Sequence, residues 1–451
     1  MNHRILLVSL LAALGVAADA DWPRWRGPDL DGVARGDAPL SWGDDKNIAW
    51  KANIAGKGHS SPVIWGDKIF LTTAVQIGEA AAETAAAAPA PAPAPGGPGG
   101  RRGPGGPGGG GGAGGGAGAL VEHNFDLVCL DRKTGKVIWQ KTAVKATPHE
   151  GYHRRYGSFA SHSPVTDGKH VIAFFGSRGV YAFDLNGNKV WGKDLDVKMR
   201  MRLAFGEGTP PTLYQDTLLL KFDQEGESFM IALDKNTGNE KWRVARDEQS
   251  SWSPPYVVEH GGKKQVVVSA TNKVRSYDLA AGKLLWETPG LGSNVIPAPI
   301  YYKGIIYVMS GHRDPKLMAI KLTADGGFDS VAWSLDRGTS YTASPVFHDN
   351  ILYFVTDSGM LTALNAATGE PYYHQQRLPK AYNFKASPVA AGGKLYLSTE
   401  DEDVVVVKLG QQFEVLATNK LTDQSFIASP AIADGEIYLR GQNTLFCIRG
   451  K

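Results

Sequence analysis

A Ser-Pro dipeptide, or a close variant of it, recurs along the chain and divides it into segments of similar length. After the first gap the copies lie roughly 42 to 46 residues apart, which is the length of one four-stranded propeller blade. Eight markers therefore predict eight blades. The copies are Ser61-Pro62, Ser163-Pro164, Thr209-Pro210, Ser253-Pro254, Ala298-Pro299, Ser344-Pro345, Ser387-Pro388 and Ser429-Pro430.

A second repeat predicts β-hairpins between these markers. Residues 125–139, FDLVCLDRKTGKVIW, predict a strand buried on at least one face, a tight turn and a second strand of β-branched and aromatic residues. Asp131 can hydrogen-bond the turn backbone, and Gly135 can take the positive φ that a tight turn needs. Related stretches return at 181–191, 231–242, 277–286 and 361–373, with a weaker copy at 317–333. We therefore expect each blade to run from strand A after Ser-Pro to strand D near a Trp.

The two ends of the repeat predict how the ring closes. The last blade stops near residue 448 without a fourth strand, whereas residues 47–54 look like a lone strand D containing Trp50. Pairing these two pieces would remove both exposed sheet edges. We expect a propeller over residues 47–451, preceded by an extended segment at 21–46 and interrupted by a disordered Ala/Pro/Gly-rich loop at 77–118.

The first twenty residues predict export. A basic start, an apolar run from Ile5 to Val16 and the tripeptide Ala18-Asp19-Ala20 are typical of a cleaved signal peptide. Cleavage after residue 20 would leave Asp21 first, and the absence of a nearby Cys argues against a lipid anchor. No other apolar run is long enough for a transmembrane span. We expect a periplasmic or secreted monomer.

Composition argues against one class of ligand and leaves the state of the two cysteines undecided. The formal net charge of +3 on 451 residues comes without a basic stripe, so nucleic acid is not expected as a ligand. Cys129 and Cys447 occupy equivalent strands in the first and last blades. They are either two small buried hydrophobic residues or, in an oxidising compartment, a disulfide.

The hairpin signature A-x-D-x-x-T-G-x-x-x-W resembles the tryptophan-docking motif of the pyrroloquinoline-quinone (PQQ) type eight-bladed propellers, most closely at 231–242. The opening residues 21–28, DWPRWRGP, look like the start of exported bacterial PQQ-like repeat proteins. The resemblance implies an all-β, eight-bladed β-propeller whose tryptophans dock neighbouring blades. The residues in that position are Trp50, Trp139, Trp191, Trp242, Trp286 and Trp333.

Two groups of relatives imply different functions. Quinoprotein dehydrogenases hold PQQ between a Trp and two adjacent cysteines, with calcium on Glu and Asn. This chain has neither a Cys-Cys pair nor a haem-binding C-x-x-C-H motif. The propeller lipoprotein of the outer-membrane β-barrel assembly machinery is the other relative. We expect an exported non-catalytic binding or scaffold propeller, without a cofactor, that engages protein, polysaccharide or other envelope ligands. The alternative is an oxidoreductase that uses PQQ and calcium, or another metal, on an alcohol or sugar.

Candidate ligand residues lie where the D–A and B–C connections of all blades converge on one face, called here the funnel face. We assign no catalytic residue. An H-x3-H-x8-H pattern, His149, His153 and His162, is a weak metal candidate and otherwise a solvated loop. The ligand-binding candidates are polar or aromatic side chains just before the Ser-Pro markers or near B–C loops: His59, His162, Arg178, Asp223, Trp252, Asn272, Asn294, Arg313, Tyr341, Asp357, Asn383 and Glu400.

Overall fold

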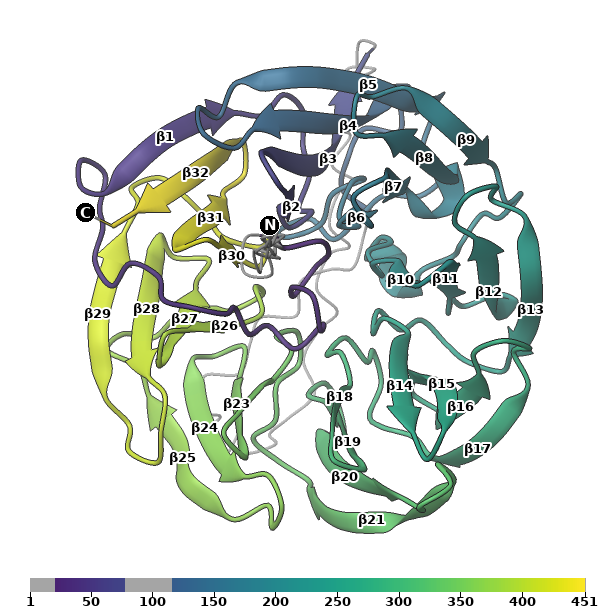
Figure 1. Ribbon diagram of the computed structural model, residues 1–451, viewed down its shortest axis with the longest axis vertical. Coiled ribbons are helices and arrows are strands. Elements are labelled where there is room, and N and C mark those ends of the chain that lie inside the picture. The colour runs from purple at the N-terminus through teal and green to yellow at the C-terminus, as the bar shows by residue number, and fades with distance from the viewer. Residues whose placement is uncertain (1–20, 78–115, 451) are drawn as a thin grey trace, which may run out of the picture.

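The computed structural model describes residues 21–77 and 116–450. The expected signal peptide at 1–20 and most of the 77–118 tract lie outside the described residues. The described chain forms eight four-stranded antiparallel sheets arranged in a ring around a central channel (Figure 1), which confirms the predicted eight-bladed propeller. No helix in the described ranges has the length and apolar character needed to cross a membrane.

The strands follow the chain blade by blade, from the channel outward. Blade 1 holds β2 (Val63–Trp65), β3 (Lys68–Gln76), β4 (His123–Asp131) and β5 (Val137–Ala146). Blade 2 holds β6 (Val165–Thr166), β7 (His170–Phe174), β8 (Val180–Asp184) and β9 (Lys189–Lys193). Blade 3 holds β10 (Thr212–Tyr214), β11 (Thr217–Phe222), β12 (Ser228–Asp234) and β13 (Glu240–Arg246). Blade 4 holds β14 (Tyr256–His260), β15 (Lys263–Val268), β16 (Lys273–Asp278) and β17 (Leu284–Pro289).

The second half of the ring repeats this order. Blade 5 holds β18 (Ile300–Tyr302), β19 (Ile305–Ser310), β20 (Lys316–Leu322) and β21 (Phe328–Leu335). Blade 6 holds β22 (Val346–His348), β23 (Ile351–Val355), β24 (Met360–Asn365) and β25 (Pro371–Arg377). Blade 7 holds β26 (Val389–Ala391), β27 (Lys394–Ser398), β28 (Asp403–Lys408) and β29 (Val415–Lys420). Blade 8 holds β30 (Ala431–Ala433), β31 (Glu436–Arg440), β32 (Thr444–Arg449) and β1 (Ile48–Asn53). Two short 3-10 turns, η1 (Gly176–Arg178) and η2 (Arg202–Ala204), lie in connections.

Ring closure comes from the first strand of the chain, as predicted. β1 pairs antiparallel with β32, placing Trp50 opposite Cys447. Both Cys129 and Cys447 are free and buried, and burial raises the pKa of each thiol to about 12. The two cysteines are therefore small buried residues in equivalent strands of neighbouring blades, and they do not form a disulfide in this structure.

Strand D tryptophans connect several blades to the next one. In five blades the indole N–H donates to a backbone carbonyl in the C–D turn of the following blade. The turn glycine lies directly beneath the ring: Gly135 has a φ of 71°, and a Cβ there would come within 2.4 Å of the Trp50 ring. The hydrogen bonds are Trp50 to Arg132 (3.0 Å), Trp139 to Leu185 (3.1 Å), Trp191 to Lys235 (2.8 Å), Trp242 to Leu279 (2.9 Å) and Trp333 to Ala366 (3.0 Å).

Blade 4 contacts blade 5 through an intermediate side chain, because blade 5 lacks the Thr-Gly turn. The Trp286 indole donates to Oε1 of Gln265 at 2.9 Å, within its own blade. The Gln265 amide then donates to the backbone carbonyl of Gly326 at 3.1 Å. The weaker repeat at 317–333 thus corresponds to a different inter-blade contact.

The serines of the Ser-Pro markers form a second, inner set of inter-blade bonds. Five of these serines accept, through Oγ, the backbone N–H of the equivalent position in the preceding blade, and the series crosses the junction between the last and first blades. Ser253 Oγ instead donates to the carbonyl of Pro297 at 2.9 Å. The five bonds run from Ala298 to Ser344 (2.9 Å), Ser344 to Ser387 (2.9 Å), Ser387 to Ser429 (3.0 Å), Ser429 to Ser61 (3.0 Å) and Ser61 to Ser163 (2.8 Å).

The segment before β1 crosses blade 7 and reaches the centre of the ring (Figure 1). Val33 pairs in parallel with Ala390 of the innermost strand β26, and Trp22 pairs with Ile64 of β2. Trp22 is 1% exposed and Arg26 is fully buried. This segment therefore fills part of the channel.

Replacing Trp50 by Ala should destabilise the ring at its closure. The change removes the bond to Arg132 and leaves space above Gly135. Because Trp50 is half-buried, we expect the free energy of unfolding to fall by about 2–3 kcal/mol, toward the low end for aromatic truncation. Urea unfolding measures the change. The control is Ile138→Ala, at a side chain that is 48% exposed, and it should change the free energy of unfolding by less than about 0.5 kcal/mol. If both substitutions lowered the free energy of unfolding equally, the Trp50 contact would not be what stabilises ring closure.

Candidate functional site

A cavity of about 210 Å³ opens at the centre of the funnel face, where the connections of all blades meet. Its floor includes Trp25 from the N-terminal segment, whose indole N–H donates to Ser429 Oγ at 3.2 Å. Serines of the inner hydrogen-bond ring, such as Ser61 and Ser387, form part of its wall. The cavity is therefore built by the same contacts that join the blades.

Aromatic side chains provide much of the remaining surface. His153 stacks on Tyr156 with ring centroids 3.5 Å apart and contacts Phe205 edge-on at 5.1 Å. The Trp252 indole donates to the carbonyl of Gly206 at 2.9 Å, and both residues line the cavity. Flat aromatic faces are suited to stacking against a planar group.

The charged groups at the cavity are paired with one another. Glu207 accepts from Arg178 at 2.7 Å and from the backbone N–H of Ser177 at 2.6 Å. Lys385 lies 2.7 Å from Asp357 and 3.5 Å from Glu400.

Arg155 completes the charged rim. It pairs with Glu400 at 3.0 Å, which fastens the connection between blades 1 and 2 to blade 7. Lys385 also lies 5.0 Å from the Tyr156 ring centre, a cation–π distance. The cavity mouth is thus crossed by residues 153–156.

Two histidines at the site are held neutral. Burial, with smaller effects of Arg440 and Lys57, lowers the pKa of His59 to about 3, while its Nδ1 contacts the Tyr156 carbonyl at 3.0 Å. Burial and then Arg178 lower the pKa of His162 to about 3. An efficient general base has a pKa near the working pH. Neither imidazole meets that requirement at neutral pH.

The structure brings some sequence candidates to the cavity and places others elsewhere. His59, Trp252 and Tyr341 line it. A second group lies behind the lining: Asn294 donates to Tyr341, Arg178 pairs with Glu207, Asp357 and Glu400 hold Lys385, and His162 packs on Phe174. Arg313 and Asn383 are exposed to solvent.

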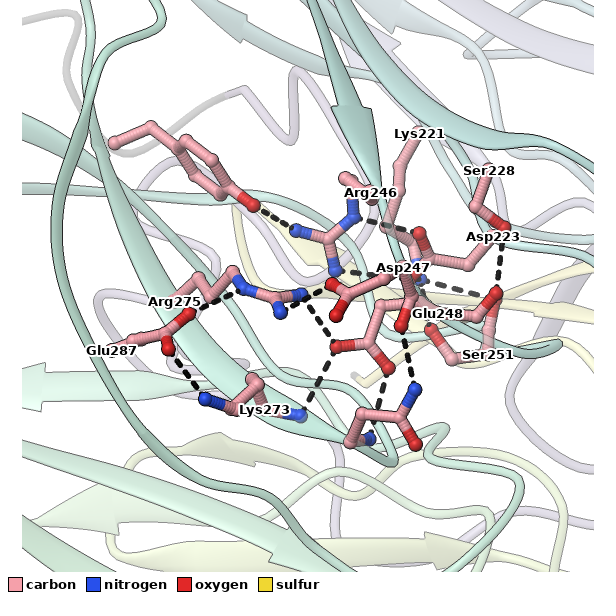
Figure 2. A network of polar contacts seen from close by, with 12 residues as sticks. Lys221, Asp223, Ser228, Arg246, Asp247, Glu248, Ser251, Lys273, Arg275 and Glu287 are labelled. Carbon is pink, nitrogen blue, oxygen red and sulfur yellow. Dashed lines mark hydrogen bonds and ion pairs between the residues drawn. The ribbon is translucent and has the colours of Figure 1, made fainter.

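Asp223 belongs to a separate buried network between blades 3 and 4 (Figure 2), and the exposed Asn272 lies at the edge of that network. Asp223 accepts from Arg246 at 2.7 Å and lies 3.1 Å from Lys221, and all three side chains are fully buried. Although burial opposes it, Arg246 and then Lys221 lower the pKa of Asp223 to about 2, whereas burial lowers that of Lys221 to about 8. The Asp223 carboxylate is thus already bonded to buried side chains of the protein.

The same network continues into blade 4. Arg275 bonds Glu248 at 2.8 Å and Glu287 at 3.0 Å. Glu248 also accepts the backbone N–H of Asn272 at 2.9 Å, and the Asn272 amide donates to the Asp247 carbonyl at 2.6 Å. Asn272 therefore fastens one blade to the next.

The three histidines of the H-x3-H-x8-H pattern have separate contacts. His149 bonds the Met199 carbonyl at 2.7 Å, His153 stacks on Tyr156, and His162 is buried against Phe174. In the part of the chain that the structure describes, no three His, Cys, Asp or Glu side chains are grouped to hold a metal ion.

The donor set does not fit a calcium–PQQ site. Calcium takes six to eight oxygen ligands. The carboxylate that lines this cavity, Glu207, already bonds Arg178 and Ser177 through its two oxygens. Both cysteines lie in the buried strands β4 and β32, away from the cavity lining. The cavity is also smaller than the roughly 300–1,000 Å³ typical of ligand pockets.

Several lining residues were missed from the sequence. Trp25 lies in the segment that was expected only to be extended, and its proximity to Ser429 depends on ring closure. Lys385 stands two positions from the candidate Asn383 in the same connection, so a full list of charged residues before each Ser-Pro marker would have included it. Glu207 precedes Thr209-Pro210 in the same way.

Comparison with known proteins gives one family and several structural neighbours. A family model described as "Outer membrane protein assembly factor BamB" matches residues 92–228 and 226–449. The chain is 27% identical over 203 residues to outer membrane protein assembly factor BamB of Burkholderia pseudomallei, covering 42% of this chain and 47% of that protein. It is 22% identical over 311 residues to tetrathionate hydrolase of Acidithiobacillus ferrooxidans, covering 63% and 55%. The chain thus spans about half the length of these curated relatives.

Among solved structures, a europium-containing methanol dehydrogenase matches with a TM-score of 0.60 at 12% identity. The match covers 94% of this chain and 91% of that one. At this identity the likeness concerns the propeller fold.

Replacing His162 by Phe should make the free energy of unfolding depend less on pH below neutrality. Between about pH 6.5 and 3 the unfolded chain binds a proton at His162 that the folded chain does not, so stability falls as the pH falls. The substitution should reduce that slope by up to about 1.4 kcal/mol per pH unit. Urea unfolding from pH 4 to 7 measures this slope. The control is His374→Phe, at a histidine that is exposed. An unchanged slope in His162→Phe would show that the histidine is protonated in the folded state.

Proposed function

Because the chain belongs to the family described as outer membrane protein assembly factor BamB, we propose that it is an exported, non-catalytic binding propeller of the cell envelope. Its funnel face would engage a protein or other envelope ligand, and the central cavity would receive a group of that ligand. The family and the position of the cavity support this role. Export by a cleaved signal peptide and action as a monomer are part of the same proposal.

One observation carries the proposal. Charged groups at the cavity are already bonded to one another, whereas the aromatic side chains Trp25, Trp252 and Tyr341 line the cavity. Catalysis by acid–base or nucleophilic chemistry needs a group free to exchange a proton or form a bond. Recognition needs concave surface with a few oriented polar groups. The arrangement therefore favours binding.

Site-specific photocross-linking tests the binding role. A benzophenone amino acid in place of Tyr341 would lie in the cavity, whereas the same group in place of Leu284 would lie on the outer strand β17, where Leu284 is 43% exposed. In cells that naturally make the protein, we expect a discrete adduct from position 341 and none from position 284. Equal labelling at both positions would contradict a specific role for the cavity.

The oxidoreductase alternative makes an opposite prediction. Purified protein beginning at Asp21 would be titrated with PQQ and calcium, followed by cofactor absorbance and by dye-linked turnover of alcohols and sugars. We expect no saturable 1:1 binding with turnover, because the carboxylate that lines the cavity, Glu207, is already bonded to Arg178 and Ser177. Stoichiometric binding with turnover would overturn the proposal.

A further inference from the structure

A short turn, residues 153–157, lies at the mouth of the central cavity and is called here the flap. Two of its side chains, His153 and Tyr156, line the cavity. The flap begins at a bonded position, because the His153 backbone N–H donates to the Phe205 carbonyl at 3.0 Å. It is closed as a turn by the Gly157 N–H, which donates to the His153 carbonyl at 2.8 Å. Part of the cavity wall is therefore a turn rather than a strand.

The tip of the flap is held by side chains of other blades. Among the described residues, no backbone-to-backbone hydrogen bond involves the three residues between its ends. Arg155 pairs with Glu400 at 3.0 Å, and Lys385 lies 5.0 Å from the Tyr156 ring centre. His59 Nδ1 contacts the Tyr156 carbonyl at 3.0 Å. Segments with so few backbone bonds open locally at a small fraction of the global free energy of unfolding.

Release of the tip leaves no buried charge without a partner. The Glu400 side chain is 4% exposed, but it also lies 3.5 Å from Lys385, which in turn keeps Asp357 at 2.7 Å. Arg155 is already 63% exposed, so it passes into water at little cost. Breaking a buried ion pair is costly chiefly because it strands one charge, whereas exposed pairs contribute little. The closed flap is therefore held weakly.

We propose that the flap opens and closes over the central cavity, and that the Arg155–Glu400 ion pair sets how often it is open. This inference rests on the proposed function, in which the cavity is the ligand site, and it adds how access to that site is regulated. Opening would move Tyr156 off a cavity that is about 210 Å³ when closed, and closing would place this ring against the ligand group. Because salt screens an exposed ion pair, opening should increase with ionic strength.

A cysteine inside the cavity measures access without knowledge of the ligand. Ala428 lines the cavity and is 5% exposed, so Ala428→Cys introduces a small thiol there. The native Cys129 and Cys447 are fully buried in strands, and the chain without the substitution gives the background rate. The readout is the rate of alkylation by iodoacetamide, an uncharged reagent, followed by mass spectrometry on the chain beginning at Asp21.

Removing the ion pair should speed this alkylation. In the Ala428→Cys background we expect Arg155→Gln to raise the rate about three- to fivefold, as the loss of an exposed ion pair allows. Raising the salt concentration from about 0.05 to 0.5 M should speed the background protein similarly and leave Arg155→Gln unchanged. The matched control is Arg154→Gln, at the neighbouring exposed arginine, which should alter neither the rate nor its salt response. Equal effects of both substitutions, or no effect of Arg155→Gln, would overturn the proposal.

A glycine substitution tests the closed turn without changing charge. A Cβ at Gly157 would lie 2.7 Å from the His153 nitrogen, so Gly157→Ala should disfavour the closed flap and also speed alkylation. Gly208 lines the same cavity, but a Cβ there would come no closer than 3.5 Å to Ser161, so Gly208→Ala is the control and should leave the rate unchanged. Equal rates in both variants would refute the flap, and a cross-link from position 341 would then still support the binding role. Faster alkylation in Gly157→Ala without that cross-link would support the flap and count against the cavity as the ligand site.

Discussion

The structure depends on the antiparallel pairing of β1 with β32, because a propeller with an open junction has two exposed sheet edges and an unsupported channel. Two arginines reinforce the junction from opposite sides of the ring. Arg132 of blade 1 donates to Tyr438 and to the carbonyl of Ala433 in blade 8, and Arg440 of blade 8 bonds Ser60 in blade 1. The serine hydrogen bonds also cross this junction, from Ser429 to Ser61. Closure is therefore supported at the inner, middle and outer strands.

Closure and the binding cavity are parts of one arrangement. The chain that supplies β1 first crosses blade 7 and fills the channel, and this path places Trp25 on the cavity floor with Arg26 beneath it. The hydroxyl of Ser429 accepts both the Ser387 N–H of the serine ring and the Trp25 indole. A ligand in the cavity would thus contact groups that also hold the blades together. Binding is expected to stabilise the closed ring by mass action.

Much of the fold could be predicted from the sequence because it is periodic. The Ser-Pro markers and the Asp-to-Trp hairpins repeat at blade spacing, so the number of blades and the closing strand followed from counting. The serines were recognised as markers, but their role as acceptors between blades was not, since an inter-blade bond joins residues about one blade apart. The turn glycines were explained by positive φ alone, although the ring of the preceding blade also requires the absence of a Cβ.

The cavity was harder to predict because sequence order does not fix side-chain direction in irregular connections. Asn383 and Lys385 lie in one connection, yet Asn383 is exposed while Lys385 reaches the cavity. Asp223 occupies a B–C loop like other candidates, but fully buried Arg246 and Lys221 hold it inside the wall of the ring. These outcomes depend on which partners the closed ring brings near, and such partners are far apart in the chain.

Native-state hydrogen exchange of the β1 amides tests most directly the claim that the closing strand holds the ring and its cavity together. If closure is part of the global structure, amides of β1 that pair with β32 will exchange as slowly as those of β31 and β32, and all will respond equally to low concentrations of denaturant. If β1 instead exchanges much faster through local opening while blades 1 and 8 stay protected, the ring is stable without its closing strand and the account is wrong.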